Sequence, residues 1–178
     1  MNFFETLLSF KTERPNDKFG RLLFNLAYLL AFIGGLILVI VILVNVISII
    51  SRIIFSNPLV GDFELVKMGS AVAIASFFPI CHLKKGNVIV DFITANLNFK
   101  KIFFLDALSS FVYGLVSCFF TWRMIYGAHD MYKYAEETML LQFPVWIPFI
   151  PVTFSFGLLS FCCLYTFFKE YNNLSSKV

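Results

Sequence analysis

The chain has 178 residues, of which 59% are hydrophobic and 14% are charged, and its net charge at pH 7 is +3. This composition excludes an ordinary water-soluble domain, and no basic stripe with interleaved aromatic residues suggests nucleic-acid binding. Four long segments have no Asp, Glu, Lys, Arg or His in their middles. About 20 apolar residues form a helix that crosses the ~30 Å hydrocarbon core of a bilayer. The sequence therefore predicts an all-α membrane protein, with one membrane domain over 1–178 and four transmembrane helices.

The predicted elements begin with a polar N-terminal arm over 1–20. The transmembrane spans follow at approximately 22–51, 64–83, 102–126 and 146–168. The first span has thirty uncharged residues, which at ~1.5 Å per residue make a helix of ~45 Å that must tilt or protrude. Prolines interrupt the approach to the fourth span, so we interpret 138–150 as an interfacial or re-entrant segment before a helix from about Pro151.

A short amphipathic helix is predicted over 87–98, between the second and third spans. Its polar residues recur at spacings of four, three and four, and its apolar residues occupy another face; the polar set is Asn87, Asp91, Thr94 and Asn98, and the apolar set is Ile89, Phe92, Ile93 and Leu97. Such a helix lies along a bilayer surface. The lysines that flank it are expected to contact anionic lipid headgroups; they are Lys84, Lys85, Lys100 and Lys101.

The distribution of Lys and Arg predicts the orientation of the spans. Ten of them lie in the N-terminal arm, the middle connection and the tail, against four in the other two connections. Basic residues favour the cytoplasmic side. Both termini and the middle connection are therefore expected in the cytoplasm, and the first and third connections on the outer side of the membrane.

The sequence offers no catalytic, cofactor-binding or metal-binding residues. Ionisable residues at mid-membrane depth mark transport and proton-relay sites, and here the spans lack them, which suggests a subunit that supports chemistry performed elsewhere. Charged residues near the span ends are candidates for a partner interface or a structural role; they are Arg52, Glu64, Lys67, Asp91, Asp106 and Arg123. Trp122 and Trp146 are expected to be aromatic anchors at the outer interface.

Glu64 permits two interpretations. It lies three residues before Lys67 and can pair with it, and together with Asp62 it can cap the start of the second span and complement the helix dipole. The alternative is a coupling carboxylate in a self-contained four-helix exporter. We favour the structural role, because both acidic residues follow Asn57-Pro58 and Gly61 at the helix start.

The two histidines bear on a third class, the membrane-anchor subunit of a redox complex. Bis-histidine haem ligation needs both rings at one depth, but His82 is expected at the inner end of the second span and His129 beyond the outer end of the third. Small residues also recur along two spans, as Gly69, Ala73 and Ser76 and as Ser110, Gly114 and Cys118. Such patterns favour close helix packing in lipid, within the chain or against a second protein.

Four spans, an acidic residue that opens the second, and a specific stretch after it resemble one known family. The stretch is Lys84-Lys85-Gly86-Asn87-Val88-Ile89-Val90-Asp91-Phe92. Over roughly residues 18–170 the chain is similar to the small membrane subunit, or Q subunit, of tripartite ATP-independent periplasmic (TRAP) transporters. In that family a His often precedes the apolar residue at the position of Val88, where this chain has Asn87.

The resemblance implies a partner. In the family a large membrane subunit holds the substrate and sodium sites and moves as an elevator, while a soluble periplasmic protein delivers an organic acid such as sialic acid or a C4-dicarboxylate. The small subunit enlarges the static scaffold, contacts phospholipid and helps to dock the binding protein. The resemblance therefore implies no enzyme activity and no cofactor in this chain, with sodium coupling in the large subunit.

Overall fold

A computed structural model describes residues 17–56, 59–84 and 99–176, with side-chain surroundings in the last range for 105–169. Four helices make up the described fold: α2 (Lys18–Phe55), α3 (Asp62–Leu83), α5 (Phe99–Lys133) and α6 (Trp146–Ser176). All four are long and apolar enough to cross a membrane. This confirms the predicted all-helical class with four spans. The predicted amphipathic helix at 87–98, with Asp91 and the neighbouring Lys85, lies outside the described residues.

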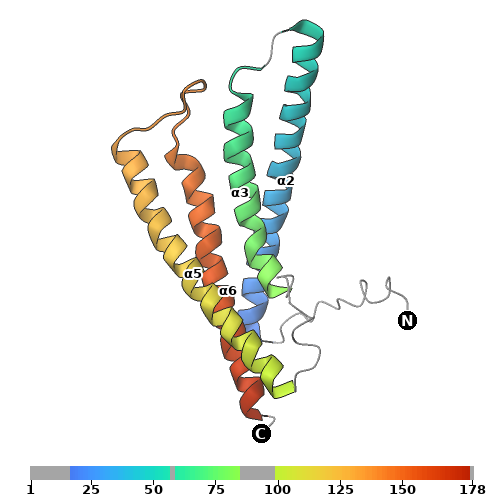
Figure 1. Cartoon of the computed structure of the whole chain (residues 1–178), viewed down its shortest axis with the longest axis vertical. Helices are drawn as coiled ribbons and strands as arrows, with labels where there is room; N and C mark the ends of the chain where they lie inside the picture. The colour runs from blue at the N-terminus through green and yellow to red at the C-terminus, as the bar shows by residue number, and fades with distance from the viewer. Residues whose placement is uncertain (1–16, 57–58, 85–98, 177–178) are drawn as a thin grey trace, which may run out of the picture.

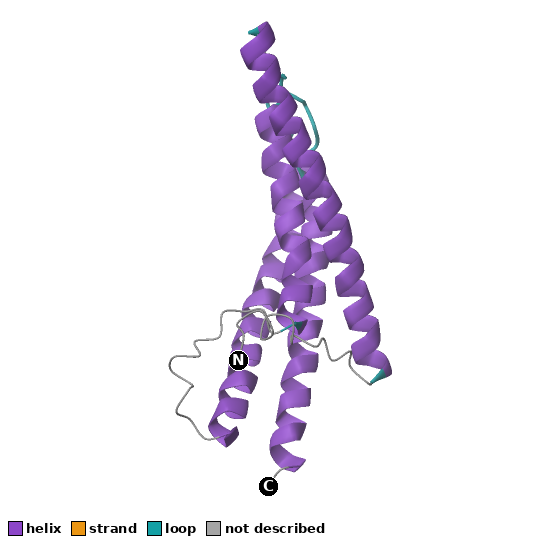
Figure 2. Ribbon diagram, turned by 90° about the vertical axis from the view of Figure 1, so that its right-hand side faces the viewer, coloured by secondary structure: helices purple, strands orange, loops and turns teal. Residues whose placement is uncertain are grey.

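The helices form two hairpins that pack together mainly through α3 and α6. α2 packs on α3, α5 packs on α6, and α3 joins the hairpins by packing on α6. We call the end that holds the 56–61 and 134–145 connections the loop end, and the opposite end the termini end. Figure 1 shows the hairpins diverging towards the loop end, where α2 extends furthest. Figure 2 shows the same bundle turned by 90°, with the helices running along its length.

A core of residues from α2 and α6 closes the termini end. Leu23 and Ala27 of α2 and Leu158 and Cys162 of α6 form a buried cluster. In each pair the residues are four apart, so both side chains project from the same helix face. Tyr165 extends the contact, because its ring lies 6.2 Å from that of Phe19, centroid to centroid. Packing at this end is therefore dense, in contrast to the loop end.

Small residues bring α2 and α3 close together. A Cβ atom added at Gly34 would lie 2.7 Å from the Cβ of Ser76 and 3.1 Å from the carbonyl oxygen of Ala73. A Cβ at Gly69 would overlap Val41. The small residues of the second span are thus used for packing within the chain, which settles for this helix a question that the sequence left open.

Small residues also bring α5 and α6 close together. A Cβ at Gly114 would lie 3.2 Å from the Cβ of Cys163, and Ala107, Ser110 and Ser117 are buried on the same face of α5. Cys118, which the sequence pattern grouped with Ser110 and Gly114, is exposed. The packing face of α5 therefore continues through Ser117 rather than through Cys118.

α2 presents most of its surface outward. It has 38 residues, or ~57 Å at ~1.5 Å per residue, which fits the expectation of a tilted or protruding helix. Five of its residues are buried: Gly20, Leu23, Ala27, Gly34 and Ser48. Most of its other apolar side chains are exposed and must therefore contact lipid or another protein.

The segment before α6 differs in part from its prediction. Residues 136–145 form a short hairpin, in which Thr138 N–H donates to the Phe143 carbonyl and Val145 N–H to that of Glu136, both at 3.0 Å. The helix begins at Trp146, so a start near Pro151 is wrong. Pro148 is tolerated because the first-turn N–H groups of a helix have no intrahelical partner. Pro151 lies inside the helix without ending it.

Candidate functional site at the loop end

Asp62 fastens α3 to α2 at the loop end. The Ser48 hydroxyl of α2 donates a hydrogen bond to Oδ2 of Asp62, and Arg52 Nη2 lies 3.8 Å from the same oxygen. Oδ1 accepts the Phe63 N–H at 2.7 Å, so the carboxylate also satisfies one of the unpaired donors of the first helical turn. Gly61 allows this tight entry, because its φ of +82° lies in the left-handed region that favours glycine. Asp62 therefore stabilises the start of α3, as predicted, and also links α3 to α2.

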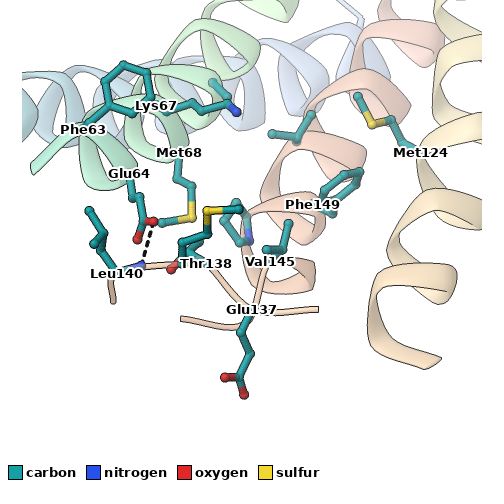
Figure 3. A pocket seen from close by; sticks show the side chains of 14 residues that line it. Phe63, Glu64, Lys67, Met68, Met124, Glu137, Thr138, Leu140, Val145 and Phe149 are labelled. Carbon is teal, nitrogen blue, oxygen red and sulfur yellow. Dashed lines mark hydrogen bonds between the residues drawn. The ribbon is translucent and has the colours of Figure 1, made fainter. Parts of the chain in front are cut away.

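Glu64 fastens α3 to the connection between α5 and α6. Its two carboxylate oxygens accept the N–H groups of Leu140 and Leu141, at 2.9 Å and 3.0 Å. The Leu140 bond is drawn in Figure 3, where Lys67 extends away from the Glu64 carboxylate. Among the ion pairs of the described residues, none joins Glu64 with Lys67. The carboxylate therefore binds backbone of another hairpin instead of the lysine one turn along its own helix.

A cavity of about 740 Å³ lies where the hairpins diverge. Its walls come from α3, α5 and α6, and the 137–140 segment covers it at the loop end. The lining is mostly apolar, and its charged residues are Glu64, Lys67 and Glu137. In the described part of the chain, no three His, Cys, Asp or Glu side chains are grouped as a metal site requires.

Comparison with known proteins identifies the family. The family model described as "Tripartite ATP-independent periplasmic transporters, DctQ component" matches residues 38–173, which is well over half of the chain. The chain belongs to this family. No curated protein and no solved structure matches the chain.

Membership in the DctQ family makes the chain a component of a transporter and not a member of an enzyme family. It implies association with a large membrane subunit and a periplasmic binding protein. Together with four helices that can cross a membrane, it supports a multi-pass protein of the inner membrane. The predicted resemblance to the small TRAP subunit is confirmed.

The other charged residues singled out in the sequence do not gather into one site. Arg123 is exposed on α5, and Asp106 is half-buried two turns from the start of that helix. Lys84 ends α3, and its N–H donates to the Ile80 carbonyl at 3.0 Å. Lys100 and Lys101 lie in the first turn of α5. In this DctQ component, Arg52, Glu64 and Lys67 lie in the half of the bundle nearer the loop end, where no ion pair of the described residues joins any two of them, while Lys84, Lys100 and Lys101 lie near the termini end.

The two tryptophans lie at different levels of the bundle. The ring of Trp146 is 5.5 Å from that of Tyr132, edge to face. Trp122 makes a similar contact with Tyr126 at 5.5 Å, but it lies ten residues before Tyr132 on α5, or ~15 Å along the helix. Trp146 is therefore the nearer of the two to the loop end, and the placement of both at one interface stays a prediction.

The histidines lie at opposite ends, as the sequence indicated. His82 is buried near the end of α3, with its ring 5.5 Å from that of Tyr113. His129 is exposed near the end of α5 and lies 3.9 Å from the Asp130 carboxylate. Within this DctQ component, a single haem could not be ligated by both.

Sequence reasoning missed the partners that organise the site. Ser48 appeared only as one residue of a long apolar run, although a hydroxyl one turn before Arg52 was a signal for a polar contact. Leu140 and Leu141 bind Glu64 through their backbone N–H groups, and a pattern of side chains along the sequence does not predict such donors. Met68, Met124 and Met139 line the cavity from three separate segments, so they could be brought together only by the fold.

Proposed function

We propose that this chain is the small membrane subunit of a sodium-driven TRAP transporter for organic acid uptake, of the sialic acid or C4-dicarboxylate class. It acts as a static scaffold for the large elevator subunit and helps to dock the periplasmic binding protein. Substrate and sodium sites belong to the large subunit under this proposal.

The exposed surface of α2 is the observation that carries the scaffold role. Side chains of Leu36, Val39, Ile40 and Leu43 are each at least half exposed, and no Asp, Glu, Lys, Arg or His occurs between Arg21 and Arg52. A long, uncharged helix with so few buried residues offers a broad surface for another membrane protein, but no group that could bind an ion or an acid at mid-depth.

The position of Glu64 supports the scaffold over a self-contained exporter. A coupling carboxylate must be able to exchange a proton or a cation for the transported molecule. The Glu64 carboxylate instead accepts two backbone hydrogen bonds at the start of α3, and such bonds hold it in a fixed contact.

The decisive experiment is reconstitution of the complex. The chain should co-purify with a large membrane subunit when the two are expressed together, and uptake of organic acid into proteoliposomes should require both proteins, the binding protein and a sodium gradient. Glu64→Gln should leave the dependence on sodium intact. A normally assembled Glu64→Gln complex that had lost all coupling would instead support the exporter, and a Soret band in the purified chain would support a redox anchor.

A further inference from the structure

The cavity at the loop end is closed above and below. At the loop end it is covered by Leu140 and its neighbours, which Glu64 holds against α3. Towards the middle of the bundle, Val72 and Ala75 of α3 and Val152 of α6 form a buried cluster, and Val152 also lines the cavity. The chain itself therefore bounds the cavity at both of these ends.

The lining favours a flexible apolar ligand. Met68, Met124 and Met139 all contribute to it, and they are three of the five methionines in the chain. Methionine has three rotatable bonds and a polarisable sulfur, so it adapts to irregular apolar shapes. The volume of about 740 Å³ lies within the range of ~300–1,000 Å³ that is usual for small-molecule sites.

Among the described residues, the cavity is lined by one cation, Lys67, together with the acidic residues Glu64 and Glu137. Lys67 lines it five residues into α3, or ~8 Å from the helix start. Its nearest carboxylate in sequence, Glu64, is bound by the two loop N–H groups, and none of the ion pairs of the described residues includes Lys67. A lysine near the end of a transmembrane helix can extend its ammonium group to the headgroup region.

We propose that this cavity binds one phospholipid from the surrounding leaflet, with an acyl chain among the three methionines and the phosphate beside Lys67. A phospholipid matches both features, because it joins an apolar chain to an anionic phosphate. A helix of a partner protein would need a groove open along its length, which the covering loop and the buried cluster exclude. This inference depends neither on the transported substrate nor on the scaffold role, because it concerns only a lipid bound in the cavity of this chain.

Two variants of the full chain test the proposal, together with one control. Ala71 lines the cavity and is exposed, so Ala71→Phe should fill the space without entering the core. Ile74→Phe is the matched control, because Ile74 is 54% exposed on the same helix and is not part of the lining. Lys67→Gln removes the charge alone.

Native mass spectrometry of the purified chain, titrated with palmitoyl-oleoyl phosphatidylglycerol, gives the readout. The wild type and Ile74→Phe should each retain one lipid after mild detergent removal, and Ala71→Phe should retain none. Lys67→Gln should bind phosphatidylglycerol roughly five-fold more weakly, which is the size expected for one lysine near an anionic headgroup. Equal retention by Ala71→Phe and the control would overturn the proposal. A co-purification with the large membrane subunit gives the other contrary result. If Ala71→Phe kept its lipid but lost that subunit, a partner protein and not a lipid would occupy the cavity.

A second measurement needs no variant and therefore does not depend on how Ala71→Phe folds. Phosphatidylglycerol with a photoactivatable group on its acyl chain is added to the wild-type chain, irradiated, and the modified peptides are identified. Labelling concentrated at Met68, Met124 and Phe149, which come from three helices, would support the site. Labelling spread evenly over the exposed face of α2 would contradict it.

Discussion

The carboxylate of Glu64 accepts a hydrogen bond from the backbone N–H of Leu140, a residue 76 positions later in the chain, at 2.9 Å. The next N–H, that of Leu141, bonds the second oxygen. Hydrogen bonds to an ionised acceptor are shorter and stronger than those between neutral groups. At the loop end, where the hairpins diverge, this contact fixes the α5–α6 connection against the first turn of α3.

Removing the Glu64 carboxylate should release the covering loop. In Glu64→Ala, the N–H groups of Leu140 and Leu141 lose their acceptors, so amide hydrogen exchange at both positions should become faster. Exchange in the middle of α6 should not change, because its backbone hydrogen bonds remain. Hydrogen–deuterium exchange of the purified chain in lipid nanodiscs, read by mass spectrometry, measures the difference.

Glu137→Ala is the matched control for this experiment. Glu137 belongs to the same connection, but its side chain points away from the cavity (Figure 3). Its replacement should leave the exchange of Leu140 and Leu141 unchanged. If both variants accelerated exchange equally, the loop would be held by something other than Glu64.

Two adjacent glycines of α2 should respond very differently to alanine. Gly34→Ala would place a methyl group 2.7 Å from the Cβ of Ser76, and overpacking of this kind usually costs about 1–3 kcal/mol. At Gly35, the nearest atom to an added Cβ is the Phe77 Cζ, at 4.0 Å. Gly35→Ala should therefore be neutral or slightly stabilising, because alanine favours the helix. Thermal unfolding of both variants in the same detergent gives the comparison, and equal losses of stability would show that α2 and α3 do not pack as described.

The sequence was sufficient to predict the four transmembrane spans, because a long uncharged segment can adopt few structures in a bilayer. It placed α3 within two residues of its observed start, yet it expected the helix of α6 only from about Pro151 and ended α5 seven residues early, near residue 126. The polar residues from Tyr126 to Lys133 continue the helix beyond the predicted span, and hydropathy alone measures the apolar part of a helix and not its full length.

The contacts at the loop end were less predictable than the helices. Spacing along one helix suggested that Glu64 would pair with Lys67, since residues three apart share a face. The fold offers Glu64 two backbone donors from a distant connection instead. Such a contact depends on how α6 packs on α3, which local spacing does not encode.

Exposed charges at the loop end should influence the approach of the binding protein. Asp130 and Lys133 are exposed near the end of α5, whereas Asp62 and Glu64 are already bound within the chain. Reversing Asp130 and Lys133 together should mainly slow association and change its salt dependence, because charges at the rim of an interface act chiefly on the association rate. Stopped-flow binding of the periplasmic protein to the reconstituted complex at two ionic strengths tests this. Association kinetics that did not change would exclude this surface from docking.

The orientation of the bundle can be tested by labelling single cysteines in a chain whose four native cysteines are replaced. Tyr134 is 68% exposed in the loop-end connection, so Tyr134→Cys should react with a membrane-impermeant maleimide added to intact spheroplasts. Lys169→Cys, near the exposed end of α6, should react only after the membrane is permeabilised, because the excess of Lys and Arg at the termini end favours the cytoplasm. The reverse pattern of labelling would place the loop end, and with it the proposed lipid site, on the cytoplasmic side.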